Sequence, residues 1–112
     1  MTLVRSGGAQ TEPQAPDGFA IRKSIRVEGI VQGVGFRPYV FRLATERGLA
    51  GSIGNNARGV IIEIEGARER VEEFVSALTR EAPPLARIVR VSVSDLSATG
   101  ESEFRIVETS RG

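Results

Sequence analysis

The sequence predicts an α+β fold, a two-layer sandwich in which two helices cover one face of a mainly antiparallel sheet. Short stretches alternate apolar and polar residues at period two, and two longer stretches show the apolar spacing of amphipathic helices. Their order is strand, helix, strand, strand, helix, strand, followed by one short terminal strand. Right-handed strand–helix–strand crossovers then place both helices on the same face, which is the ferredoxin-like arrangement.

The first half of the predicted domain holds a strand, a helix and a second strand. Residues 24–32 alternate apolar and polar side chains, which predicts a half-buried strand. The helix is predicted at 38–47, because Pro38 suits a first helical turn and Gly48 is a natural C-terminal stop. The second strand is predicted at 49–55.

The second half begins with a hairpin turn at 56–59, which leads into a third strand at 59–66. The second helix is predicted at 67–80 and ends before a Pro-Pro pair, and two strands follow at 87–94 and 103–108. The apolar positions on which these elements rest are Ile25, Val27, Val31, Phe36, Val40, Phe41, Leu43, Ala44, Ile53, Val60, Ile62, Ile64, Val71, Phe74, Val75, Leu78, Val89, Val91, Val93, Phe104 and Ile106.

The N-terminal segment differs from the rest in composition. Residues 1–22 mix Gly, Pro, Gln and Thr without apolar periodicity, which predicts a disordered tail before an ordered domain at 23–110. Within the tail, Phe19 and Ile21 are candidates for packing onto the edge of the domain.

The composition also argues against several classes of function. The net charge is +1, from 15 basic and 14 acidic residues, which gives no electrostatic argument for nucleic acid or an anionic membrane. The chain has no Cys and no His, so the commonest general base and metal ligand is missing. Glu63 and Glu65 stand where an RNA-binding sheet would expose aromatic residues. We expect a cytoplasmic protein that binds neither nucleic acid nor membranes.

The stretch on which we expect function to depend is residues 29–38, GIVQGVGFRP. Gly33 and Gly35 let backbone N–H groups converge on an anion, the helix start adds free N–H groups, and Arg37 offers a planar fork of donors. A Walker loop would need Gly-Lys-Ser/Thr, a dinucleotide loop would need a third glycine where Pro38 stands, and a thiolate phosphatase would need a Cys. Two interpretations remain: an oxyanion cradle, or a tight turn whose glycines serve only backbone shape.

Two motifs resemble the acylphosphatase family, and the resemblance covers residues 24–108. The motifs are Gly29-x-Val31-Gln32-Gly33-Val34-Gly35-Phe36-Arg37 and Gly51-x-Ile53-x-Asn55-x-x-x-Gly59, with Ile where the family pattern has Val. Within that family, Pro38 directly after the Arg and the segment Pro83-Pro84-Leu85-Ala86-Arg87-Ile88 are similar to the N-terminal domain of the carbamoyltransferases that mature nickel–iron hydrogenases, the HypF family.

The resemblance implies hydrolysis of the carboxyl–phosphate anhydride of acyl phosphates, with carbamoyl phosphate as the expected substrate and without a metal or other cofactor. The residues expected to bind the phosphoryl group are Gln32, Gly33, Val34, Gly35, Phe36 and Arg37. Arg37 is expected to neutralise charge in the transition state, and Asn55 to orient the attacking water, while Asn56 serves only the turn. The alternative is a non-catalytic module that captures phosphate or carbamoyl phosphate for other domains or for hydrogenase maturation proteins.

Overall fold

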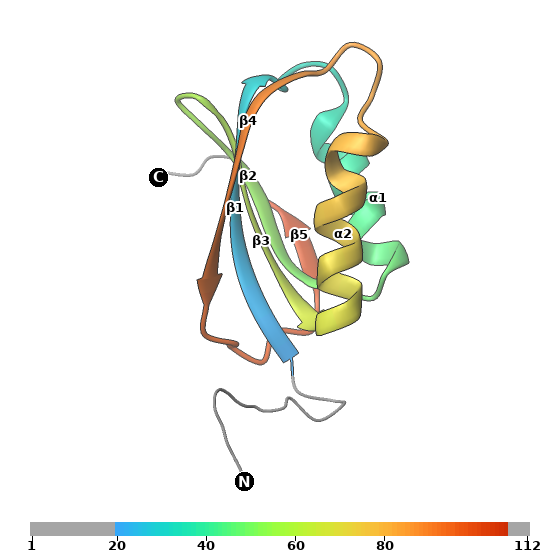
Figure 1. The fold of residues 1–112 in the computed structure, drawn as a ribbon, viewed down its shortest axis with the longest axis vertical. Coiled ribbons are helices and arrows are strands. Elements are labelled where there is room, and N and C mark those ends of the chain that lie inside the picture. The colour runs from blue at the N-terminus through green and yellow to red at the C-terminus, as the bar shows by residue number, and fades with distance from the viewer. Residues whose placement is uncertain (1–19, 108–112) are drawn as a thin grey trace, which may run out of the picture.

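The structure is a computed structural model, and it describes residues 20–107. Within this range five strands form one sheet in the order β4-β1-β3-β2-β5, and two helices lie on one face of it (Figure 1). The elements are β1 (Ala20–Ile30), α1 (Phe36–Glu46), β2 (Ala50–Asn56), β3 (Gly59–Ala67), α2 (Arg68–Arg80), β4 (Arg87–Leu96) and β5 (Phe104–Ile106). The prediction of a ferredoxin-like sandwich is therefore confirmed.

The sheet is mainly antiparallel, as predicted. β1 lies inside the sheet and pairs antiparallel with β3 and β4, while β2 pairs antiparallel with β3 and parallel with β5. Ile62 of β3 lies opposite Ile25 on one side and Ile53 on the other, and all three side chains are fully buried. This row of isoleucines marks the face of the sheet that carries the core.

The two helices pack on this face of the sheet and cover the core. α2 packs on β1 and β3, and α1 packs on β2 and β5. The Tyr39 hydroxyl of α1 joins the helices by donating to the carbonyl oxygen of Leu78 at 2.7 Å, with that of Ala77 at 3.0 Å. Burial raises the pKa of Tyr39 to about 12, so the hydroxyl stays protonated and remains a donor. Neither helix is long and apolar enough to cross a membrane.

β1 begins earlier than predicted, at Ala20 instead of residue 24. Its first residues pair with β3 on one side and with the last residues of β4 on the other, and Ile21 packs against the core. The predicted disordered tail of residues 1–22 is therefore wrong for 20–22, which are part of a strand. The remainder of that tail, including Phe19, lies outside the described residues.

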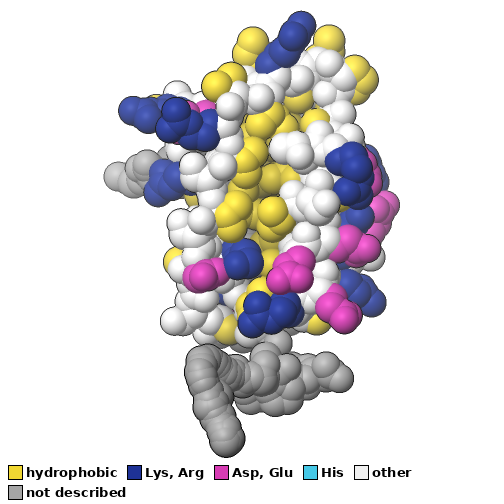
Figure 2. Space-filling model, viewed as in Figure 1, with side chains coloured by type: hydrophobic (Ala, Val, Ile, Leu, Met, Phe, Trp, Pro, Cys, Tyr) yellow, Lys and Arg dark blue, Asp and Glu magenta, His cyan; other side chains and the backbone are white. Residues whose placement is uncertain are grey.

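The apolar residues of the edge strands are more exposed than their alternation predicted. Val89 and Val93 of β4 are 78% and 44% exposed, and Ile106 of β5 is 43% exposed. β4 and β5 are the two edge strands of the sheet, and Figure 2 shows exposed apolar side chains between β4 and α2. Phe41 is also 39% exposed instead of belonging to the core, although its ring packs edge-on against Phe104 at 6.1 Å between centroids.

Candidate active site

The loop between β1 and α1 contains two glycines in the left-handed backbone conformation. Gly33 and Gly35 have φ angles of 74° and 80°, in the left-handed region that glycine adopts without strain. A Cβ atom at either position would meet nothing within 4 Å, so the glycines are needed for their dihedral angles and not for space. Gly35 is the N-cap of α1, whose first N–H groups have no partner within the helix.

Arg37 lies in the first turn of α1, one residue after the helix begins. Its neighbour Phe36 is buried, with its ring 5.5 Å from that of Tyr39, and this packing anchors the start of the helix. Arg37 itself is only partly buried, and within residues 20–107 no carboxylate lies close enough to form an ion pair with it. The guanidinium group is thus available to an anion at the helix N-terminus.

Asn55 lies near the end of β2, on the face of the sheet that carries the helices. Two residues earlier Ile53 is fully buried on that face, and across the sheet Asn55 is opposite Val60, which is also fully buried. The Oδ1 atom of Asn55 is buried and has no hydrogen-bond partner among the described residues. A buried carbonyl oxygen without a partner is unfavourable, and this atom is chemically able to accept a hydrogen bond.

The structure brings the loop and the β2–β3 turn together through Gln32. Its Nε2 atom donates to the carbonyl oxygens of Gly59 at 2.9 Å and of Asn56 at 3.2 Å. Gly59 also lets β3 approach β1, because a Cβ atom there would lie 2.0 Å from the carbonyl oxygen of Val27. The two motifs noted in the sequence are therefore neighbours in space. The sequence pointed to Gln32 only as a phosphate-binding loop residue, and its side-chain contacts were missed.

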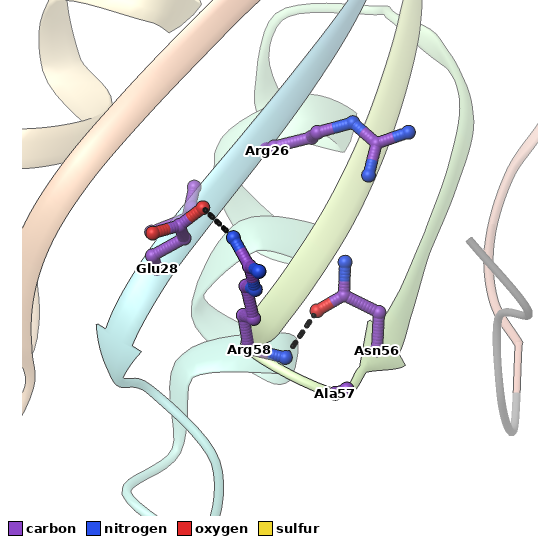
Figure 3. Close-up of a pocket in the computed structure, with 6 residues that line it drawn as sticks. Arg26, Glu28, Asn56, Ala57 and Arg58 are labelled. Carbon is purple, nitrogen blue, oxygen red and sulfur yellow. Dashed lines mark hydrogen bonds and ion pairs between the residues drawn. The ribbon is translucent and has the colours of Figure 1, made fainter.

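Asn55 and Asn56 face opposite sides of the sheet. The Asn56 Oδ1 atom accepts from the backbone N–H groups of Arg58 at 2.9 Å and of Gly59 at 2.8 Å, which is the role of a turn residue. Its side chain lines a pocket of about 330 Å³ on the face without helices, where Arg58 pairs with Glu28 at 3.8 Å (Figure 3). This pocket is separate from the predicted site.

The described part of the face without helices carries charged side chains. Glu63 and Glu65 lie there, as predicted, together with Arg22, which forms ion pairs with both at 2.6 and 2.7 Å. The described aromatic residues lie elsewhere: in α1, in α2, and at Phe104, which is buried against α1. A base-stacking platform is therefore missing from the described part of this face.

Fold and site together define a class of protein: a small α+β domain with a glycine loop and an arginine at the start of a helix. The family model for acylphosphatase matches residues 23–106, and the chain belongs to the acylphosphatase family. This match confirms the resemblance seen in the two motifs, and the family is one of hydrolases.

Two kinds of relative share this domain. The chain is 47% identical over 92 residues to the carbamoyltransferase HypF2 of Cupriavidus necator, which covers 81% of this chain but 11% of that protein. It superposes on full-length HypF in its phosphate- and nucleotide-bound form with a TM-score of 0.80 and 33% identity, covering 86% of this chain and 13% of that one. Acylphosphatase from Bacillus subtilis matches with a TM-score of 0.71 and 36% identity, covering 80% of this chain and 99% of that one. The chain thus spans about a tenth of the length of its HypF relatives and almost the whole of a free acylphosphatase.

Proposed function

We propose that this chain hydrolyses acyl phosphates, with carbamoyl phosphate as its preferred substrate, and that Arg37 and Asn55 are its catalytic residues. The observation that carries the proposal is the buried Oδ1 atom of Asn55, which has no partner among the described residues. An amide oxygen is too weakly basic to remove a proton, but it accepts a hydrogen bond from water and so fixes the direction of attack.

The loop supplies the other half of the proposed mechanism. Backbone N–H groups of 33–37 and the Arg37 guanidinium hold the phosphoryl oxygens and neutralise the charge that develops on them. The water oxygen forms a bond to phosphorus while the bond from phosphorus to the acyl oxygen breaks, and the carboxylate leaves with the electron pair. The proton of the water passes to a phosphoryl oxygen, so no side chain has to act as a general base.

The preference for carbamoyl phosphate rests on the HypF relatives, which are carbamoyltransferases. We infer that this domain handles carbamoyl phosphate within such a protein, where hydrolysis yields carbamate and phosphate for other domains or for hydrogenase maturation proteins. The second candidate function is capture of carbamoyl phosphate without hydrolysis. The Oδ1 atom of Asn55, which lacks a partner within residues 20–107, favours hydrolysis, because a purely capturing site needs donors for the anion and no oriented water.

The test is phosphate release from carbamoyl phosphate and from acetyl phosphate by the purified chain and by Arg37→Ala. Loss of one charge-stabilising donor is expected to lower kcat about 10²- to 10³-fold. Arg42→Ala is the matched control, because Arg42 lies on the same helix, is exposed, and faces Glu46 at 3.9 Å. Turnover by Arg37→Ala at the rate of the control would overturn the assignment. If the wild-type chain shows no turnover but binds phosphate, and Arg37→Ala does not bind it, the result would support capture instead.

A further inference from the structure

The Gln32 side chain joins the two halves of the proposed active site. The two hydrogens of its Nε2 atom serve two carbonyl oxygens, those of Gly59 at 2.9 Å and Asn56 at 3.2 Å. These carbonyls stand at the two ends of the β2–β3 turn, and the residue before Asn56 is Asn55. Gln32 begins the loop that leads to Arg37, so one carboxamide connects the phosphate loop to the strand that carries the proposed water-orienting residue.

The turn that Gln32 contacts has hydrogen bonds of its own. Asn56 closes it internally by accepting from the N–H groups of Arg58 and Gly59. The Gly29 N–H group donates to the carbonyl oxygen of Arg58 at 3.3 Å, a second link between the turn and the end of β1. Because the turn holds its own shape, a contact at its ends sets the position of the whole turn, including the end of β2.

Asn55 depends on such external support. Its Oδ1 atom has no hydrogen bond to the described part of the chain, so its position is set by the backbone of β2 and by packing. A displacement of this backbone relative to the loop would move the oriented water relative to the phosphoryl group. Misplacement of a reacting group by about 1 Å can lower a rate about 10²-fold.

We propose that Gln32 is a positioning residue, whose side chain sets the distance between Asn55 and the phosphate loop through the β2–β3 turn. The inference rests on the proposed function and deepens it. Its alternative is that the Gln32 side chain contacts the bound phosphoryl group directly, since this residue is exposed at the mouth of the loop. The two alternatives differ in what they predict for phosphate binding and for a combined mutation with Asn55.

The experiment is a double-mutant cycle of Gln32→Ala and Asn55→Ala, with kcat, KM and the inhibition constant for inorganic phosphate measured for each variant. If Gln32 is a positioning residue, Gln32→Ala lowers kcat about tenfold or more and leaves the inhibition constant for phosphate within a factor of about two. In the Asn55→Ala background, Gln32→Ala should lower kcat little further. Gln32→Glu keeps the shape but has no donors for the two carbonyls, so its kcat falls at least as far. Additive losses, or a phosphate constant raised in Gln32→Ala together with the loss of kcat, would overturn the inference.

Controls separate this inference from the proposed function. Arg58→Ala truncates an exposed side chain of the same turn, 78% exposed and directed to the opposite face, and is expected to keep wild-type kinetics. In the NMR spectrum of Gln32→Ala, the side-chain amide signals of Asn55 should shift, whereas in Arg58→Ala they should not. An inactive wild-type chain would refute the proposed function, and unmoved Asn55 signals in Gln32→Ala would refute the positioning role itself.

Discussion

Glu65 of β3 is the basis of our most detailed prediction. Its side chain is 3% exposed on the face of the sheet without helices, beside Arg22, which is 6% exposed. Glu65 accepts hydrogen bonds from the Arg22 Nη1 atom at 2.7 Å and from the backbone N–H groups of Thr99 at 2.8 Å and Gly100 at 2.7 Å. The carboxylate thus fastens the segment between β4 and β5 onto the sheet.

Glu65→Gln should lower the free energy of unfolding by about 2–3 kcal/mol. Removing one partner of a buried ion pair typically costs about 3–5 kcal/mol, because the remaining charge stays buried. The loss should fall below that range because Arg22 keeps Glu63 at 2.6 Å and Glu101 at 3.3 Å. For a domain of this size, such a loss lowers the Tm by about 10–20 °C.

The effect should depend on pH in a defined direction. Burial by itself raises the pKa of Glu65, but hydrogen bonds from the Thr99 N–H, from Arg22 and from the Gly100 N–H outweigh burial and lower the pKa from its ordinary value of 4.5 to about 2. A carboxyl whose pKa is lower in the folded state stabilises the fold above its unfolded pKa. The stabilisation is therefore complete above about pH 4.5 and is lost as the pH falls toward 2.

Urea unfolding of wild type and Glu65→Gln between pH 7 and pH 3 tests both statements. The gap in unfolding free energy should be full at pH 7 and should narrow below pH 4.5. Glu103→Gln is the control, because Glu103 is exposed and forms no ion pair within the described residues, and it should change stability by less than about 0.5 kcal/mol. A Glu65→Gln protein as stable as wild type at pH 7, or a gap that does not change with pH, would refute the reasoning.

Two further predictions concern α1. Tyr39→Phe should lower the free energy of unfolding by about 1 kcal/mol, because it removes the hydroxyl that donates to the Leu78 carbonyl. Urea unfolding of this variant and of wild type measures the difference. Gly35→Ala should weaken the inhibition by inorganic phosphate and lower stability by about 1 kcal/mol, because its φ of 80° is unfavourable for alanine although space is free. Unchanged phosphate inhibition in Gly35→Ala would show that the cradle does not depend on this dihedral angle.

The sequence predicted the fold well because each of its elements has a local signal. Apolar alternation and helical spacing located five strands and two helices, and glycine and proline placed most of their ends within a few residues. The β1–α1 loop could also be predicted, since positive φ angles at Gly33 and Gly35 follow from residue type and position. The roles of Arg37 and Asn55 remain predictions that the proposed kinetics will test.

Other features could not be predicted because they depend on partners far away in the sequence. Alternation indicates which residues of a strand share a face, but it does not indicate whether a helix covers that face. For this reason Val89, Val93 and Ile106 were expected on the apolar side of their strands, whereas Val89 is largely exposed and Val93 and Ile106 are partly exposed at the edges of the sheet. Similarly, Glu65 was correctly placed on the polar face, but its burial depends on a segment more than 30 residues later in the chain.

By itself, the sequence of this protein determined the order of the strands and helices, the geometry of the glycine loop and the two motifs of the family. These depend on dihedral preferences and on neighbours within a few residues. Only the tertiary structure decided which surfaces are covered, that the Oδ1 atom of Asn55 has no partner among the described residues, and that Gln32 joins the β1–α1 loop to the β2–β3 turn. Such contacts arise when strand pairing brings distant backbone groups to within hydrogen-bonding distance, and no local pattern in the chain records them.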